Sequence, residues 1–126
     1  SDIVSLHAPA LPSTRHMLDG GMLALLRDGA TFINTARGSL VDHAALTAEL
    51  LTGRIDAVLD VTDPEPLPPT SPLYDLPNVL LTPHVAGALG LERQRLGTLI
   101  ADEVERFVRG EPLRYRVDPA LLDRSA

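Results

Sequence analysis

The stretch ATFINTARGSLVDHAALTAELLTGRIDAVLDV (30–61) predicts a strand, a helix and a second strand in succession. The apolar runs 30–36 and 56–61 contain β-branched residues and are typical of buried strands. Between them, Asp42 can cap a helix that carries apolar residues at helical spacing and ends at Gly53. Two strands joined by a helical crossover run parallel, so this stretch predicts the centre of a parallel sheet.

The same alternation extends on both sides of this stretch. DIVSLH (2–7) and NVLLT (78–82) predict two further buried strands, and 22–26 predicts a short helical segment. The stretch 64–77 holds six prolines and is too rigid for regular structure. Apolar residues in 89–108 recur every three or four positions, which predicts a long amphipathic helix. Together these elements predict an α/β fold, a parallel sheet with helices on both faces.

Composition restricts the classes of function. The chain has 126 residues, of which 44% are hydrophobic and 3% aromatic, enough for one domain with an aliphatic core. The formal charge of −6 argues against a nucleic-acid surface, and no apolar run reaches the roughly 20 residues that a membrane span requires. Cysteine is absent, which excludes disulfides and is compatible with the cytoplasm, where we expect the protein. The four histidines do not have the spacing of a metal site, so we expect no metal.

Polar residues follow the ends of the predicted strands, where open parallel sheets bind their ligands. Arg37 follows the second strand, Glu65 lies a short loop after the third, and His84 follows the fourth. A histidine can exchange a proton near neutral pH, a nearby carboxylate favours its protonated form, and an arginine grips a carboxylate in two places. These three residues could bind a 2-keto acid and protonate its oxygen during reduction. Each also has a structural interpretation, as an isolated structural histidine, a surface arginine or a solvated carboxylate.

Three ordered motifs resemble those of a known enzyme family. INTARGSLVD (33–42), LDVTDPEPLP (59–68) and LPNVLLTPHVAG (76–87) are similar in sequence, order and separation to the D-isomer-specific 2-hydroxyacid dehydrogenases. This family includes phosphoglycerate, glycerate and D-lactate dehydrogenases, and the resemblance extends over 1–112. It implies a Rossmann-like fold and NAD-dependent hydride transfer between a D-2-hydroxyacid and its 2-keto acid, with NADP not excluded. It also implies that two nucleotide-binding domains pair into a homodimer.

The resemblance assigns a role to each matching residue. Arg37 would bind the substrate, His84 would donate and accept the proton, and Glu65 would pair with that histidine. Asp60 would hold the nicotinamide amide. The other residues implied to contact the cofactor or line its site are Pro9, Thr14, Thr35, Ala36 and Gly87, together with Arg37 and His84.

The sequence also departs from the family pattern. Thr62 stands where a phenylalanine is common, and the sequence contains no G-x-G-x-x-G phosphate loop, no acidic residue for the adenosine ribose and no substrate domain. We therefore expect 1–112 to be the C-terminal portion of an NAD-binding domain, its second half, and 113–126 to be a C-terminal tail. Alone, this portion should turn over little substrate. The alternative is a catalytically inactive half-domain that serves as an interaction or structural module, but the presence of all three candidate catalytic residues favours the enzyme.

Overall fold

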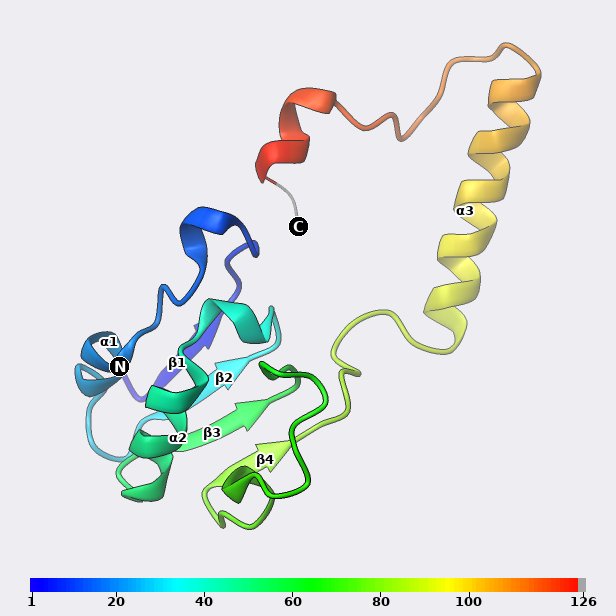
Figure 1. Cartoon of the computed structure of the whole chain (residues 1–126). Coiled ribbons are helices and arrows are strands. Elements are labelled where there is room, and N and C mark those ends of the chain that lie inside the picture. The colour runs from blue at the N-terminus through cyan, green and yellow to red at the C-terminus, as the bar shows by residue number, and fades with distance from the viewer. Residues whose placement is uncertain (125–126) are drawn as a thin grey trace. The chain divides into compact units, whose positions relative to one another are not determined.

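The computed structural model describes residues 1–124, in two compact units whose described residues are 1–86 and 87–124 (Figure 1). The last two residues of the predicted tail, at 125 and 126, lie outside the described residues. All four strands belong to the first unit and form one sheet in the order β1-β2-β3-β4, with every neighbouring pair parallel. Their bounds are Ile3–Leu6 (β1), Thr31–Asn34 (β2), Asp56–Leu59 (β3) and Val79–Leu81 (β4). The predicted strands and the parallel sheet are confirmed.

The register of the sheet brings the carboxyl ends of its strands to one edge. Leu6 pairs with Asn34, Asn34 with Leu59, and Leu59 with Leu81, and each of these is the last residue of its strand. The loops that leave the four strands therefore start side by side. This edge is where an open parallel sheet binds ligands.

Two helices of the first unit pack on the same face of the sheet. They are α1 (Gly20–Ala24) and α2 (His43–Leu51), which contact each other. Parallel crossovers are almost always right-handed, so helices between strands added in one direction lie on one face. Within residues 1–86 these two helices therefore cover one face of the sheet, where the sequence predicts helices on both. Helix α2 begins as the sequence indicates, because the Asp42 side chain accepts a hydrogen bond from the backbone N–H of Ala45 at 3.0 Å.

The core lies between these helices and the sheet and is mainly aliphatic. Its side chains are fully or almost fully buried, and each large one contributes about 1.5–3 kcal/mol by its removal from water. The largest are Leu23, Phe32, Leu40, Leu46, Leu50, Ile55, Leu59 and Leu73. The aliphatic core that the composition predicts is therefore present in the first unit.

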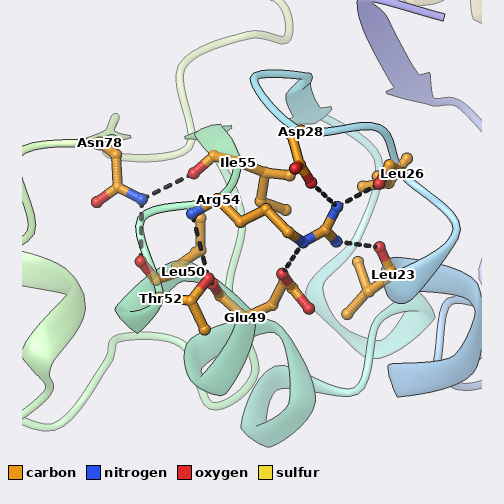
Figure 2. Close-up of polar contacts among 9 residues, drawn as sticks. All are labelled: Leu23, Leu26, Asp28, Glu49, Leu50, Thr52, Arg54, Ile55 and Asn78. Atoms are coloured by element: carbon orange, nitrogen blue, oxygen red, sulfur yellow. Dashed lines mark hydrogen bonds and ion pairs between the residues drawn. The ribbon is translucent and has the colours of Figure 1, made fainter.

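Arg54 ties α2 to the connection between α1 and β2, as Figure 2 shows. Its guanidinium donates to the backbone carbonyls of Leu23, at 3.0 Å, and of Leu26. The same group pairs with Glu49 at 2.6 Å and with Asp28 at 3.2 Å. The Arg54 side chain is only 24% exposed, so these contacts are partly shielded from water.

Asn78 closes the neighbouring turn (Figure 2). Its side-chain Nδ2 donates to the carbonyls of Leu50 at 3.0 Å and Ile55 at 2.7 Å. The residue that leads into β4 thus holds the end of α2 against the start of β3. Like Arg54, it lies at the amino ends of the strands, the edge opposite the predicted site.

The second unit contains the long helix α3 (Leu91–Val108), which confirms the helix that the apolar spacing predicts. Its apolar side chains, among them Leu96, Ile100, Val104 and Phe107, are exposed. The helix ends at Val108, Arg109 caps it, and Gly110 follows with a φ of +70°, a conformation that favours glycine. Among the helices of residues 1–124, none has the length and apolar character that a bilayer crossing requires.

Candidate active site

The buried side chain of Asn34 shapes the loop that follows β2. Its Oδ1 accepts the N–H of Ala36 at 3.0 Å, and its Nδ2 donates to the carbonyl of Arg37 at 3.0 Å. Arg37 then leaves this closed turn with an extended backbone, at φ −149° and ψ 147°. Asn34 was not among the predicted site residues. A polar residue at the end of an otherwise apolar strand is the sequence signal that could have found it.

Gly38 joins this loop to the loop that follows β3. A Cβ atom at position 38 would lie 2.0 Å from the carbonyl oxygen of Thr62 and 2.7 Å from the backbone nitrogen of Asp63. Both neighbours are backbone atoms, so only glycine permits this approach. The Thr62 hydroxyl in turn donates to the carbonyl of Pro64 at 2.9 Å, just before Glu65. The residue that departs from the family pattern thus shapes the approach to Glu65.

His84 and Glu65 form a close pair at the carboxyl ends of β3 and β4. His84 Nδ1 lies 2.7 Å from Glu65 Oε1, and the two side chains are 46% and 43% exposed. His84 adopts a φ of +54°, and its backbone N–H donates to the carbonyl of Thr82 at 3.0 Å. With Nδ1 on the carboxylate, Nε2 lies on the opposite side of the ring. The arrangement is that of a histidine oriented by a carboxylate for proton transfer.

Asp60 directly follows β3 and is buried, with 3% of its surface exposed. Its Oδ1 accepts from the hydroxyl of Thr82 and from the N–H of Val85 at 2.8 Å, and its Oδ2 accepts from the N–H of Ala86 at 2.8 Å. Burial by itself would raise the pKa of Asp60, but these three hydrogen bonds and the nearby His84 bring the pKa below its usual value. Asp60 is therefore a carboxylate in the folded protein.

The hydrogen bonds of Asp60 also determine whether its carboxylate can accept a further bond from a nicotinamide. A carboxylate offers about four acceptor positions, two on each oxygen. The protein fills three of them, which leaves one on Oδ2. A carboxamide N–H can donate to that position, so the residue present fits the amide of a nicotinamide cofactor.

A cavity of about 640 Å³ lies beside the histidine–glutamate pair. Asp60, Glu65 and His84 contribute to its lining. Leu67 and Tyr74, which the sequence analysis did not single out, line it as well, and the Tyr74 hydroxyl donates to the carbonyl of Leu67 at 3.1 Å. Its size is that of a small-molecule site.

The other predicted residues lie outside the lining of this cavity. The Arg37 side chain is directed at its own chain, because Nη1 donates to the carbonyl of Ala36 at 2.6 Å. In the loop after β1, the Thr14 hydroxyl donates to the carbonyl of Pro9 at 2.7 Å, so these two residues close a turn together. Thr35 directly follows β2. The remaining predicted residue, at position 87, opens the second unit.

Within residues 1–124, no three or more His, Asp or Glu side chains gather in a way that could hold a metal ion.

A parallel sheet with polar side chains gathered at the carboxyl ends of its strands is the arrangement of a nucleotide-binding domain. The sequence profile of the family "D-isomer specific 2-hydroxyacid dehydrogenase, NAD binding domain" matches residues 1–86, and the chain belongs to this family. The predicted family and its Rossmann-like fold are confirmed, and the family is one of NAD-binding domains.

Relatives and solved structures agree with this assignment. The chain is 42% identical to a glyoxylate reductase of Thermofilum pendens, over 98% of this chain and 35% of that protein. It superposes on the TT0316 protein of Thermus thermophilus with a TM-score of 0.85 and 42% identity, over 94% of this chain and 38% of that one. A D-isomer specific 2-hydroxyacid dehydrogenase of Xanthobacter autotrophicus, solved with NADPH and MES, gives a TM-score of 0.79 and 44% identity, over 95% and 49% of the two chains. The chain spans about a third of the length of the curated relatives it matches.

Proposed function

We propose that this chain supplies the acid/base machinery of a dehydrogenase that transfers a hydride between NAD(H) and a D-2-hydroxyacid/2-keto acid pair. The observation that carries the proposal is the 2.7 Å contact between His84 Nδ1 and Glu65 Oε1 beside a cavity of about 640 Å³. An acid/base pair at this edge of a parallel sheet lies where a nicotinamide domain performs its chemistry. Membership of the family adds independent support.

His84 is the proposed acid and base. In the direction of reduction, its Nε2 donates a proton to the carbonyl oxygen of the keto acid, which becomes the hydroxyl of the product. In the direction of oxidation, the same atom accepts that proton. Glu65 holds the opposite nitrogen, which fixes the ring and balances the positive charge of the protonated form.

Arg37 is the proposed substrate-binding residue. Its guanidinium can form two parallel hydrogen bonds with the carboxylate or carbonyl group of a keto acid. The side chain donates to the carbonyl of Ala36, and a bound carboxylate would compete for that donor. Because Asn34 fixes the backbone of Arg37, only side-chain rotation is needed for this exchange.

A bound nicotinamide supplies the hydride. On the protein side, Asp60 would accept from its amide through the remaining position on Oδ2. The other residues proposed to line the cofactor site are Pro9, Thr14, Thr35, Ala36 and Gly87. We take NAD as the cofactor, with NADP as the alternative that a direct comparison of the two would test.

The same proposal covers the organisation of the protein. Residues 1–112 would be the C-terminal portion of an NAD-binding domain, and 113–126 a C-terminal tail. Two copies would pair as a homodimer in the cytoplasm. The intact mass of the protein in its own cells, followed by sedimentation of the purified protein, tests the length of the chain and the pairing.

The chemistry is tested by substitution of His84. In the intact protein, His84→Asn should lower the reduction of a panel of 2-keto acids by about 10²–10⁴-fold and weaken NADH binding far less than it lowers turnover. His16→Asn is the matched control, because His16 has a φ of +51° against +54° for His84 and asparagine tolerates this conformation. Near-normal turnover by His84→Asn would contradict the assignment of His84 as the acid and base. A wild-type protein that reduces none of the keto acids would favour the inactive module.

A further inference from the structure

The backbone of His84 adopts a positive φ, a conformation that is uncommon for residues with a side chain. A φ of +54° lies in the left-handed region, which only a few per cent of non-glycine residues adopt, although histidine is found there more often than most. Such a conformation persists when the surrounding structure holds it. The residues around His84 must therefore stabilise this backbone conformation.

The side chain of Asp60 makes hydrogen bonds on both sides of His84. Before the histidine, it accepts from the hydroxyl of Thr82, and after the histidine it accepts from the N–H groups of Val85 and Ala86, each at 2.8 Å. The segment 82–86 is thus closed around one carboxylate. The ionised side chain suits all three bonds, because protonation would turn one of its oxygens into an O–H donor among groups that donate to it.

The sheet fixes Asp60 itself. Its backbone N–H donates to the carbonyl of Asn34 at 3.0 Å, and the N–H of Thr82 donates to the carbonyl of Leu59 at 3.0 Å. With 3% of its surface exposed, Asp60 has little contact with the water that would otherwise compete for these bonds. The carboxylate is a buried, rigid anchor, while the side chains of the pair it supports are almost half exposed.

We propose that Asp60 is a positioning residue for proton transfer: its carboxylate holds the turn 82–86 so that His84 presents Nδ1 to Glu65 and Nε2 to the substrate. This role is separate from a contact with the cofactor amide, since it uses the three acceptor positions that the protein already fills. It rests on the proposed function, because it concerns the same acid/base histidine.

Nuclear magnetic resonance of the full 126-residue chain tests this role without turnover. The wild-type protein should show scalar couplings across the hydrogen bonds from Val85 N and Ala86 N to the carboxyl carbon of Asp60. When the ring is neutral, the ¹⁵N shifts of His84 should show the tautomer with hydrogen on Nδ1, because Glu65 accepts there.

Asp60→Asn should break this arrangement, since its amide group would point a donor at backbone N–H groups. Amide exchange at Val85 and Ala86 should become about tenfold faster, and the His84 ring should populate both tautomers. Glu65→Gln should alter the tautomer but leave amide exchange unchanged. Asp56→Asn is the matched control, an exposed carboxylate on the first residue of β3, and should change neither.

Two results would overturn the role of Asp60. One is the absence of both couplings in the wild-type protein, a measurement that does not depend on whether the variant folds. The other is a folded Asp60→Asn variant whose His84 keeps the wild-type tautomer, since a merely stabilising residue would leave the ring unchanged. If the couplings and the tautomer behave as expected but the intact protein reduces no keto acid, the proposed function fails while the positioning of His84 by Asp60 stands.

Discussion

Replacement of Gly38 by alanine tests the junction between the two loops that carry Arg37 and Glu65. The new Cβ would lie 2.0 Å from the Thr62 carbonyl oxygen and 2.1 Å from its carbonyl carbon, whereas ordinary contacts begin at 3.4 Å. One of the two backbone segments must therefore move by more than 1 Å. Overpacking of a well-packed region costs about 1–3 kcal/mol, and we expect the upper end here because neither partner is a flexible side chain.

A loss of about 3 kcal/mol lowers the melting temperature of a domain of this size by roughly 10–15 °C, which differential scanning calorimetry measures directly. The displaced loops should also misplace Arg37 relative to Glu65. A misplacement of about 1 Å can reduce turnover roughly 10²-fold, so keto-acid reduction by the intact protein should fall further than NADH binding.

Gly20→Ala provides the control for Gly38→Ala. Its Cβ would meet the Cβ of Ala45 at 3.5 Å, an ordinary contact, in the first turn of α1. We expect a change in melting temperature of at most about 3 °C in either direction, since alanine is the better helix former. If Gly38→Ala also melts within this range and keeps its turnover, the close approach of the two loops does not exist and the reasoning is refuted.

Three further perturbations address the rest of the first unit. Arg54→Met should lower the free energy of unfolding in urea by about 2 kcal/mol, whereas Arg27→Met, which removes an exposed ion pair, should change it by less than about 0.5 kcal/mol. Equal effects of the two substitutions would contradict the stabilising role of the partly buried contacts of Arg54. Asn78→Ala should cost about 1–2 kcal/mol in the same assay, because two backbone carbonyls lose their donor. Burial lowers the pKa of His43 below the ordinary 6.5, so the unfolded chain binds this proton more readily, and stability should decline as the pH falls below about 6.5. His43→Leu should flatten that decline in urea titrations at several pH values, and an unchanged slope would show that another group is responsible.

The fold follows from the sequence because its signals are local. The strands 31–34 and 56–59 are apolar runs bounded by turn residues, and Asp42 marks the start of α2 before Gly53 ends it with a φ of +72°. Each of these strands and helix ends depends on residues that are only a few positions apart in the sequence. The strands and the helix that these local signals predict are present in the folded chain.

The site could be predicted only in part, because its geometry depends on contacts between loops. Strand order in a parallel sheet places Glu65 and His84 at one edge, and their atoms lie 2.7 Å apart. The approach of Gly38 to Thr62 leaves no periodic signal, since it arises from two loops that are distant in the chain. No sequence pattern predicts that donors from the protein itself occupy three acceptor positions of the Asp60 carboxylate.

The distribution of buried polar groups indicates where the rigidity of the site resides. Asn34 and Asp60 are the buried polar side chains among the residues whose burial is described, and both lie at the carboxyl edge of the sheet. Burial of a polar group is unfavourable unless its hydrogen bonds are satisfied, and here those bonds go to the loop that carries Arg37 and to the turn that carries His84. The side chains of the proposed acid/base pair, His84 and Glu65, are themselves almost half exposed, which would allow contact with a substrate. A conservative substitution of Asn34 or Asp60 should therefore disturb the proposed proton transfer, although it leaves the proposed acid/base pair in place.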